Sequence, residues 1–207
     1  MPGAWQVPYS YTACVRVCWK TTLVIRCVTM RLTHLNEERE QLALERLQAD
    51  RSDYEPFLSK ASIDIHYGKL ARGYVDRFNA GEGDSDFNRA GAFLHNIYFP
   101  QLKAPGGSNN PRGASLMLIN SKYGSYNDFK TEITKTAMSI QGSGWVYLAR
   151  NGDIKTIKNH ALRSDIAMLI DWWEHSWFTD YGSDKTKYLD NFWKAVDWEV
   201  VNQRILT

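Results

Sequence analysis

The sequence predicts an α+β fold, in which a helical first half precedes an α/β second half with a small three-stranded antiparallel sheet. Two observations predict this architecture. Apolar residues recur at helical spacing through residues 59–79 and again through residues 86–99. Residues 145–172, in contrast, contain short runs of β-branched and aromatic residues separated by turn-forming residues.

The first half is expected to hold three helices. The first covers residues 37–47, which are rich in Glu, Arg and Leu, and the two periodic stretches form the others. A run of loop-forming residues, with the sequence APGGSNNPRG, follows at 104–113. We take this run as the boundary between a domain of residues 30–103 and a second domain of residues 114–207.

The second half is expected to begin with two helices, at residues 114–123 and 126–140, which Gly124 separates. Three strands are expected next, at 145–150, 154–158 and 167–172, and a turn at Asn151-Gly152 joins the first two of them as a hairpin. Two helices, at 188–193 and 198–205, close the chain.

The composition excludes several classes of protein. With 43% hydrophobic and 13% aromatic residues, a chain of 207 residues can bury a core without cross-links. A formal net charge of +2 is too small to argue for nucleic acid or a membrane as a partner. The three cysteines, Cys14, Cys18 and Cys27, all precede residue 30, so a disulfide scaffold is excluded, and no histidine lies among them to complete a metal site.

Residues 1–29 differ from the rest of the chain. They contain no acidic residue but do contain Arg16, Lys20 and Arg26, which interrupt every apolar run. A secretory signal and a membrane span are therefore not expected. An organelle transit peptide fits the charge but not the weak helical pattern. We interpret residues 1–29 as an extension that is unstructured or not native, with translation starting at Met30, and expect a cytoplasmic protein unless this segment directs organelle import.

Histidine and aspartate residues indicate a metal site. His66 and His95, two of five histidines, lie in separate apolar helical segments. One buried histidine is more often a core residue than a ligand, but two on separate helices favour ligation. Asp171 follows an apolar run and precedes two tryptophans, so it is expected to be buried, and a buried carboxylate needs a cation. Together with His175, these residues suit iron, manganese or zinc rather than copper(I) or an iron–sulfur cluster.

Several motifs, taken in order, resemble those of the iron/manganese superoxide dismutases. They are His66-Tyr-Gly-Lys69, Tyr74-Val75, Asn79, His95, Gly142-Ser-Gly-Trp145, Asp171-Trp-Trp-Glu-His175, Asp180-Tyr181 and Asn191-Phe-Trp193. The resemblance covers residues 54–205, and Asp-x-Trp-Glu-His is its most specific pattern. It implies a helical-hairpin domain followed by an α/β domain, which together hold one iron or manganese ion.

The resemblance also implies the ligands and the reaction. His66 and His95 would come from the helices, and Asp171 and His175 from the end of a strand and the turn after it. The ion would cycle between M(III) and M(II), converting one superoxide to oxygen and a second to hydrogen peroxide. Iron is slightly preferred over manganese.

Further residues match groups that surround the metal in this family. Tyr74 matches a gateway tyrosine, and Trp145 and Trp173 match aromatic walls of the metal pocket. His160 stands where manganese-type members supply a glutamine, and with Tyr74 it is the expected catalytic residue beside the ligands. Gly91 stands where iron-type members carry a glutamine.

Two lysines match basic residues near the entrance to the metal pocket. These are Lys69 and Lys185, and their charge would raise the local concentration of an anionic substrate. An equally open interpretation is that both are ordinary solvated side chains.

The resemblance implies a homodimer or a tetramer. Glu174 is expected to cross the dimer interface to the partner subunit's His175. Most members carry a histidine and a tyrosine that bond to each other across this interface, but this chain has Leu70 and Phe178. The paired loss leaves no orphan polar group. No nucleic-acid or membrane partner is expected.

Two other functions compete with this one. A catalytically silent, superoxide-dismutase-like protein with a structural or RNA-binding role is expected to lose ligands and gain basic charge, whereas here all four ligand positions are intact. A hydrolase that activates metal-bound solvent would need a free general base near the metal. Only His160 remains among the histidines to supply one.

Overall fold

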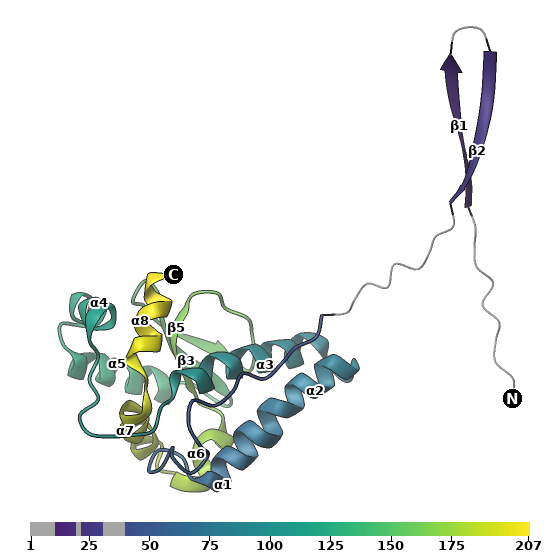
Figure 1. The fold of residues 1–207 in the computed structure, drawn as a ribbon. Helices are drawn as coiled ribbons and strands as arrows, with labels where there is room; N and C mark the ends of the chain where they lie inside the picture. The colour runs from purple at the N-terminus through teal and green to yellow at the C-terminus, as the bar shows by residue number, and fades with distance from the viewer. Residues whose placement is uncertain (1–10, 20–21, 31–39) are drawn as a thin grey trace, which may run out of the picture. The chain divides into compact units, whose positions relative to one another are not determined.

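The computed structural model describes residues 11–19, 22–30 and 40–207, which belong to two separate units (Figure 1). The first unit, Met1–Glu40, contains an antiparallel hairpin of β1 (Tyr11–Trp19) and β2 (Thr22–Met30). Both strands are rich in β-branched residues, which favour extended backbone. The hairpin differs from the unstructured extension that we expected, and the alternative that residues 1–29 are not native stays a prediction.

The second unit, Gln41–Thr207, begins with an extended segment where we expected a helix. The described part of that predicted helix, residues 40–47, has no helical turn. Asn79 accepts a hydrogen bond from the amide of Leu42 and donates to its carbonyl, at 2.8 and 2.9 Å. Asn96 bonds the amide of Glu45 and the carbonyl of Ala43 in the same way. These side chains satisfy the backbone without a helix, so tertiary contacts override the local propensity.

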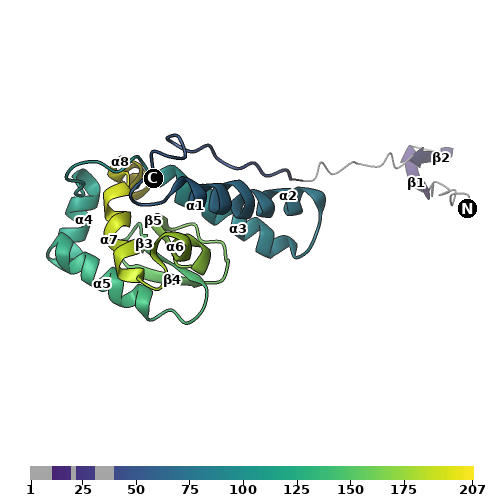
Figure 2. The same ribbon diagram turned by 90° about the horizontal axis from the view of Figure 1, so that it is seen from below.

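The predicted helix at 59–79 is confirmed but contains a wider turn. It consists of α1 (Lys60–Ile65), a π-helical turn η1 (His66–Ala71) and α2 (Arg72–Ala80). A left-handed Gly81 ends it. The third predicted helix is α3 (Ser85–Tyr98), capped by Asp84 and followed by a short 3₁₀ turn, η2 (Phe99–Gln101). Figures 1 and 2 show α2 and α3 lying side by side.

The second half has the predicted helices and strands, with one more helix. Residues 103–112 contain no regular element, although the domain boundary placed there stays a prediction. The helices are α4 (Gly113–Tyr123), α5 (Tyr126–Met138), α6 (Glu174–Tyr181), α7 (Lys185–Ala195) and α8 (Trp198–Leu206). We expected only a turn where α6 lies. Within the described residues, no helix is long and apolar enough to cross a membrane.

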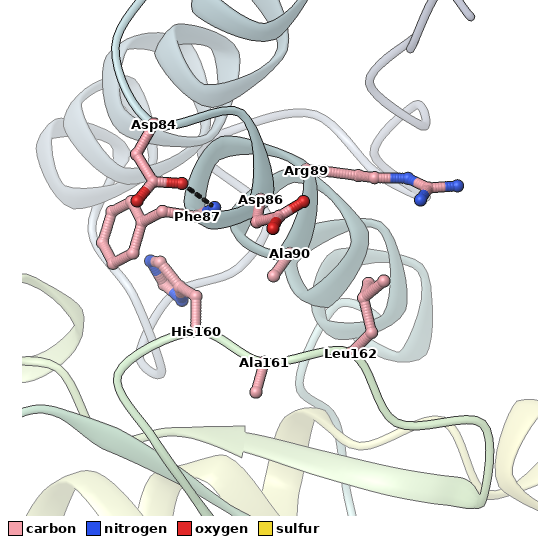
Figure 3. A pocket seen from close by; sticks show the side chains of 8 residues that line it. All are labelled: Asp84, Asp86, Phe87, Arg89, Ala90, His160, Ala161 and Leu162. Atoms are coloured by element: carbon pink, nitrogen blue, oxygen red, sulfur yellow. Dashed lines mark hydrogen bonds between the residues drawn. The ribbon is translucent and has the colours of Figure 1, made fainter.

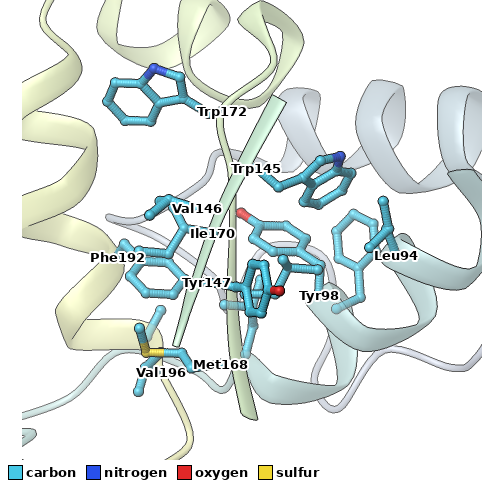
Figure 4. Packing of buried hydrophobic residues seen from close by; sticks show 14 of the residues in the cluster. Leu94, Tyr98, Trp145, Val146, Tyr147, Met168, Ile170, Trp172, Phe192 and Val196 are labelled. Carbon is cyan, nitrogen blue, oxygen red and sulfur yellow. The ribbon is translucent and has the colours of Figure 1, made fainter. Parts of the chain in front are cut away.

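A three-stranded antiparallel sheet forms the centre of the second half, as predicted. Its strands are β3 (Gly144–Ala149), β4 (Ile154–Lys158) and β5 (Ile166–Asp171), in the order β4-β3-β5. Every residue of β3 and β5 is buried. Figure 4 shows why, because Leu94 and Tyr98 of α3 lie on one side of these strands and Phe192 lies on the other. The sheet therefore keeps the C-terminal end of β5, which carries Asp171, buried inside the protein.

Candidate metal centre

Four side chains predicted as ligands meet in one cluster. They are His66 of the π-helical turn, His95 of α3, Asp171 at the end of β5 and His175 in the first turn of α6. One ligand atom from each lies within 4.8 Å of the others. His66, His95 and Asp171 are fully buried, and 18% of the His175 side chain is exposed.

The distances within the cluster fit an ion at its centre. Oδ2 of Asp171 lies 3.1 Å from Nε2 of His66. The Nε2 atoms of His175 and His95 lie 3.5 and 3.7 Å from the same oxygen. Bonds of about 2.1 Å that meet at about 90–125° would separate two ligand atoms by roughly 3.0–3.7 Å. None of these four atoms has a hydrogen-bond partner in the described structure, as expected for atoms that share a metal ion.

A backbone carbonyl orients His95, whereas Nδ1 of His66 has no hydrogen-bond partner among the described residues. His66 opens the π-helical turn, a feature that often occurs at functional sites. Nδ1 of His95 donates a hydrogen bond of 2.7 Å to the carbonyl of Gly91. Because a carbonyl can only accept, the proton of the neutral ring is on Nδ1, and the lone pair of Nε2 faces the cluster. This is the tautomer that a metal ligand requires.

Asp171 is fixed by its own strand and by the chain that follows. Its Oδ1 accepts a hydrogen bond of 2.8 Å from the amide of Trp173, which leaves Oδ2 for the cluster. Its backbone carbonyl accepts from the hydroxyl of Tyr188 at 3.0 Å. In the sheet register it stands opposite Trp145 of β3. Strand pairing and the hydrogen bonds from Trp173 and Tyr188 therefore fix both the backbone and the side chain of Asp171.

The protonation states suit a cation. Burial acts to raise the pKa of Asp171, but His175 and His66 outweigh it and hold the pKa well below its ordinary value. Burial lowers the pKa of His66 and, more strongly, that of His95. At neutral pH the cluster therefore holds Asp171 as a carboxylate and His66 and His95 as neutral imidazoles, the forms in which these groups bind metal ions.

Tyr74 lies against this cluster, and its place depends on a glycine. Its ring centroid is 5.4 Å from that of His95 and 4.9 Å from that of His160. A Cβ at Gly91 would come within 2.8 Å of the Tyr74 ring. No larger residue fits at position 91 without moving the tyrosine. Burial, with a contribution from Asp171, raises the pKa of Tyr74 to about 12, so its hydroxyl keeps its proton at neutral pH.

His160 is half-buried between aromatic rings, which the sequence did not reveal. Its ring stacks on Trp173 at 4.5 Å, and its Nδ1 accepts a 3.2 Å hydrogen bond from the indole of Trp145. The proton of the neutral ring is therefore on Nε2, which is buried and has no partner among the described residues. Burial lowers the pKa of His160 to about 4, so this ring is neutral at physiological pH.

A pocket of about 510 Å³ opens beside His160 (Figure 3). Phe87 forms another part of the pocket wall, and the centroid of its ring lies 4.7 Å from that of the His160 ring. Asp84, Asp86 and Arg89 bring two carboxylates and one guanidinium to the lining, so the pocket itself does not collect anions.

The remaining predicted residues lie farther out. Glu174 is exposed next to His175, and Phe178 of the same helix is 55% exposed. Leu70 is half-buried and Lys69 is exposed. Lys185 lies 4.6 Å over the ring of Trp177, which is a packing role that its sequence position did not indicate.

Sequence reasoning missed a buried pair of tyrosines behind the cluster. The hydroxyls of Tyr98 and Tyr188 lie 3.1 Å apart, and the ring of Tyr98 stacks on that of His66 at 5.5 Å. The only signal in the sequence was the helical spacing of Tyr98 from His95, which puts both on one face of α3.

Comparison with known proteins gives the same family throughout. The family model for the C-terminal domain of iron/manganese superoxide dismutases matches residues 111–204. The Mn/Fe superoxide dismutase of Porphyromonas gingivalis is 32% identical over 176 residues, which cover 72% of this chain and 91% of that protein. The Fe superoxide dismutase of Escherichia coli is 31% identical over 175 residues, or 72% of this chain and 91% of that protein.

An archaeal relative extends the comparison. The Fe superoxide dismutase of Sulfolobus acidocaldarius is 31% identical over 183 residues, which cover 73% of this chain and 87% of that protein. Matches of this length include both the helical half and the half with the sheet. With the fold, the cluster of three histidines and one aspartate and these relatives in agreement, the chain belongs to the iron/manganese superoxide dismutase family.

Proposed function

We propose that this protein disproportionates superoxide, with one iron or manganese ion held by His66, His95, Asp171 and His175. The observation that carries the proposal is the cluster itself, in which four buried or nearly buried ligand atoms without hydrogen-bond partners converge within 4.8 Å. A protein that had kept only the fold would have no reason to maintain this costly arrangement. The intact cluster is therefore not expected in a catalytically silent protein with a structural or RNA-binding role.

The chain would contribute binding, orientation and protons to the reaction. When bound, the ion would supply the electron exchange, so that two superoxide ions and two protons give one oxygen and one hydrogen peroxide. Trp145 would hold His160 in the tautomer that leaves Nε2–H available as a donor. Tyr74, with its raised pKa, would present a second protonated group on the same side. The surrounding aromatic rings would limit access of bulk water.

Iron is the slightly preferred metal in this proposal. Two of the relatives compared above are named for iron alone, and the third for both metals. The donor set of imidazoles and one carboxylate suits either ion. A hydrolase remains the weaker alternative, because His160 accepts from Trp145 at Nδ1 and carries its proton on Nε2, so its ring offers the cluster no free basic nitrogen.

Metal analysis with an activity assay tests the proposal. The purified protein is expected to contain about one iron or manganese ion per chain, and separate reconstitution with each metal should restore superoxide dismutation in at least one sample. Circular dichroism of the same samples reports folding. A folded chain that takes up neither metal and stays inactive would contradict the proposal and favour a structural role.

We also propose that two chains pair across α6. Metal-bound histidines usually donate their second ring nitrogen to a carboxylate or a carbonyl. Nε2 of His175 belongs to the cluster, and Nδ1 has no hydrogen bond within residues 40–207. A second copy would offer an exposed Glu174 as the missing acceptor, and the exposed Phe178 would be covered by the same contact. A tetramer would add a second contact to this dimer.

The pairing predicts a coupled loss on substitution of Glu174. Glu174→Ala is expected to weaken the dimer and to lower metal affinity by about 10–100-fold, since it removes an outer partner of a ligand. Analytical ultracentrifugation and metal titration measure the two effects. Asp190→Ala, which removes an exposed carboxylate from α7, is the control. A Glu174→Ala protein with unchanged metal affinity would contradict the proposed bond.

For the location, we propose the cytoplasm, with organelle import as the alternative if residues 1–29 act as a transit peptide, because these residues include basic but no acidic side chains.

A further inference from the structure

Arg77 is an exposed residue whose side chain is held in one place. It lies on α2, one turn after Tyr74, and its guanidinium carbon is 5.1 Å from the centroid of the Tyr74 ring. Its Nε donates a 3.1 Å hydrogen bond to Oδ1 of Asn88 on α3. An unconstrained arginine on a helix surface would sample many rotamers, so these contacts hold the side chain at a cost in conformational entropy.

Two neighbours make room for this conformation. Asn88 is only 3% exposed, and its Nδ2 donates to the carbonyl of Glu82 at 3.0 Å, so its Oδ1 is fixed toward Arg77. A Cβ at Gly73 would come within 2.9 Å of Nη1 of Arg77, a distance that real contacts do not reach. Because Gly73 has no side chain, there is space on α2 for the guanidinium of Arg77 to lie over the ring of Tyr74.

The charge of Arg77 is not neutralised by a carboxylate. Among residues 40–207, no aspartate or glutamate lies within 4.0 Å of its guanidinium. The ring of Tyr74, which lies under this guanidinium, contacts His95 of the metal cluster and His160. The ring of Tyr74 therefore lies between the positive charge of Arg77 and the metal cluster, where an anion would react. The pocket beside His160, in contrast, has more carboxylates than cations.

We propose that Arg77 is a positioning residue of the metal centre, which holds the ring of Tyr74 against it and gives its approach a positive charge. The inference rests on the proposed function, because superoxide is the anion that this charge would attract. Gly91 supports the ring from the opposite helix, since any side chain there would collide with it. Tyr74 is therefore held between a glycine of α3 and an arginine of its own helix.

Three variants separate the two roles. Arg77→Met removes the charge and the hydrogen bond to Asn88 but keeps most of the packing volume. Arg77→Lys keeps the charge but loses the planar group and the Nε donor. Arg72→Met, which removes another exposed arginine from the same helix, is the matched control. All are compared with the unmodified chain after equal metal loading.

The salt dependence of kcat/KM measures the charge. For Arg77→Met, kcat/KM at an ionic strength of 0.01 M is expected to fall about threefold, and the difference should vanish near 1 M, where the Debye length is about 3 Å. Arg77→Lys should keep the salt dependence of the unmodified enzyme. At low ionic strength, the fall in kcat/KM for Arg72→Met, relative to the unmodified enzyme, should be less than half of the fall for Arg77→Met. If Arg77→Met and Arg72→Met behave alike at low salt, the charge role is wrong.

The ring signals of Tyr74 measure the positioning and need no activity. In NMR spectra of the metal-free chain, these signals can be assigned with a Tyr74→Phe variant. They are expected to shift in both Arg77 variants and to stay unchanged in Arg72→Met. If they do not shift, the positioning role is wrong. An unmodified chain that binds metal but does not dismute superoxide would contradict the proposed function alone, because the NMR comparison would still decide whether Arg77 positions Tyr74.

Discussion

Asp171→Ala is expected to yield a folded protein that retains no metal and has no dismutase activity. Asp171 is the only carboxylate in the cluster, and its Oδ2 lies 3.1–3.7 Å from all three histidine Nε2 atoms. Loss of an outer partner of a ligand already costs about 10–100-fold in metal affinity, so loss of the charged ligand should exceed about 100-fold. Metal content after dialysis measures the effect.

Two further variants make the Asp171 result specific. Asp171→Asn keeps the size but has only one oxygen, which can either accept from the Trp173 amide or face the cluster, and it removes the negative charge, so it should bind metal more weakly than the unmodified chain. Asp165→Ala removes a carboxylate near the opposite end of β5, where it pairs with Lys155 at 2.8 Å, and should keep full metal content. Full metal content in Asp171→Ala would show that the ligand assignment is wrong.

The sequence predicted elements where local pattern and tertiary packing agree. The strand at residues 154–158 has the predicted bounds, because its β-branched residues and the Asn151-Gly152 turn both favour it. The helix predicted from residue 37 fails at Leu42 to Glu45, because its Glu and Leu content says nothing of Asn79 and Asn96, which bind that backbone from other helices. Contacts between distant residues are invisible to a local pattern.

The same limit applies to the metal centre. The identities of the clustered residues could be predicted because few residue types bind metal ions, and because a buried carboxylate near histidines requires a cation to offset its desolvation. Their orientation could not. The proton on Nδ1 of His95 depends on a carbonyl one turn away, and that on Nε2 of His160 depends on Trp145 from another strand. Protonation is decided by neighbours in space, which only the fold supplies.

The metal-free chain is expected to lose stability steeply as the pH falls from 7 to 5. Burial lowers the pKa of His66 and His95, and it lowers that of His160 to about 4. In the unfolded chain these imidazoles take up protons near pH 6.5. Below that pH the unfolded state binds protons that the folded state cannot, so the stability present above pH 6.5 is lost as the pH falls toward the folded pKa values.

The size and the origin of this loss can both be measured. His95, whose pKa lies well below its ordinary value, should contribute about 1.4 kcal/mol for each pH unit below 6.5, and His66, whose pKa is lowered less, should add a smaller amount. Asp171 has the opposite sign of dependence, since its lowered pKa confers stability that disappears only below about pH 4, outside this window. Urea unfolding at several pH values measures the slope.

His160→Gln is the informative variant, because His160 lies outside the four-residue cluster and can be replaced without removing a ligand. It should unfold with a smaller pH dependence than the unmodified chain while it still binds metal. In the metal-loaded protein the same acid range should release the ion, because protons compete for the ligand nitrogens. A metal-free chain whose stability is constant between pH 7 and 5 would mean that these imidazoles are not buried in the neutral form, and the electrostatic account of the site would be wrong.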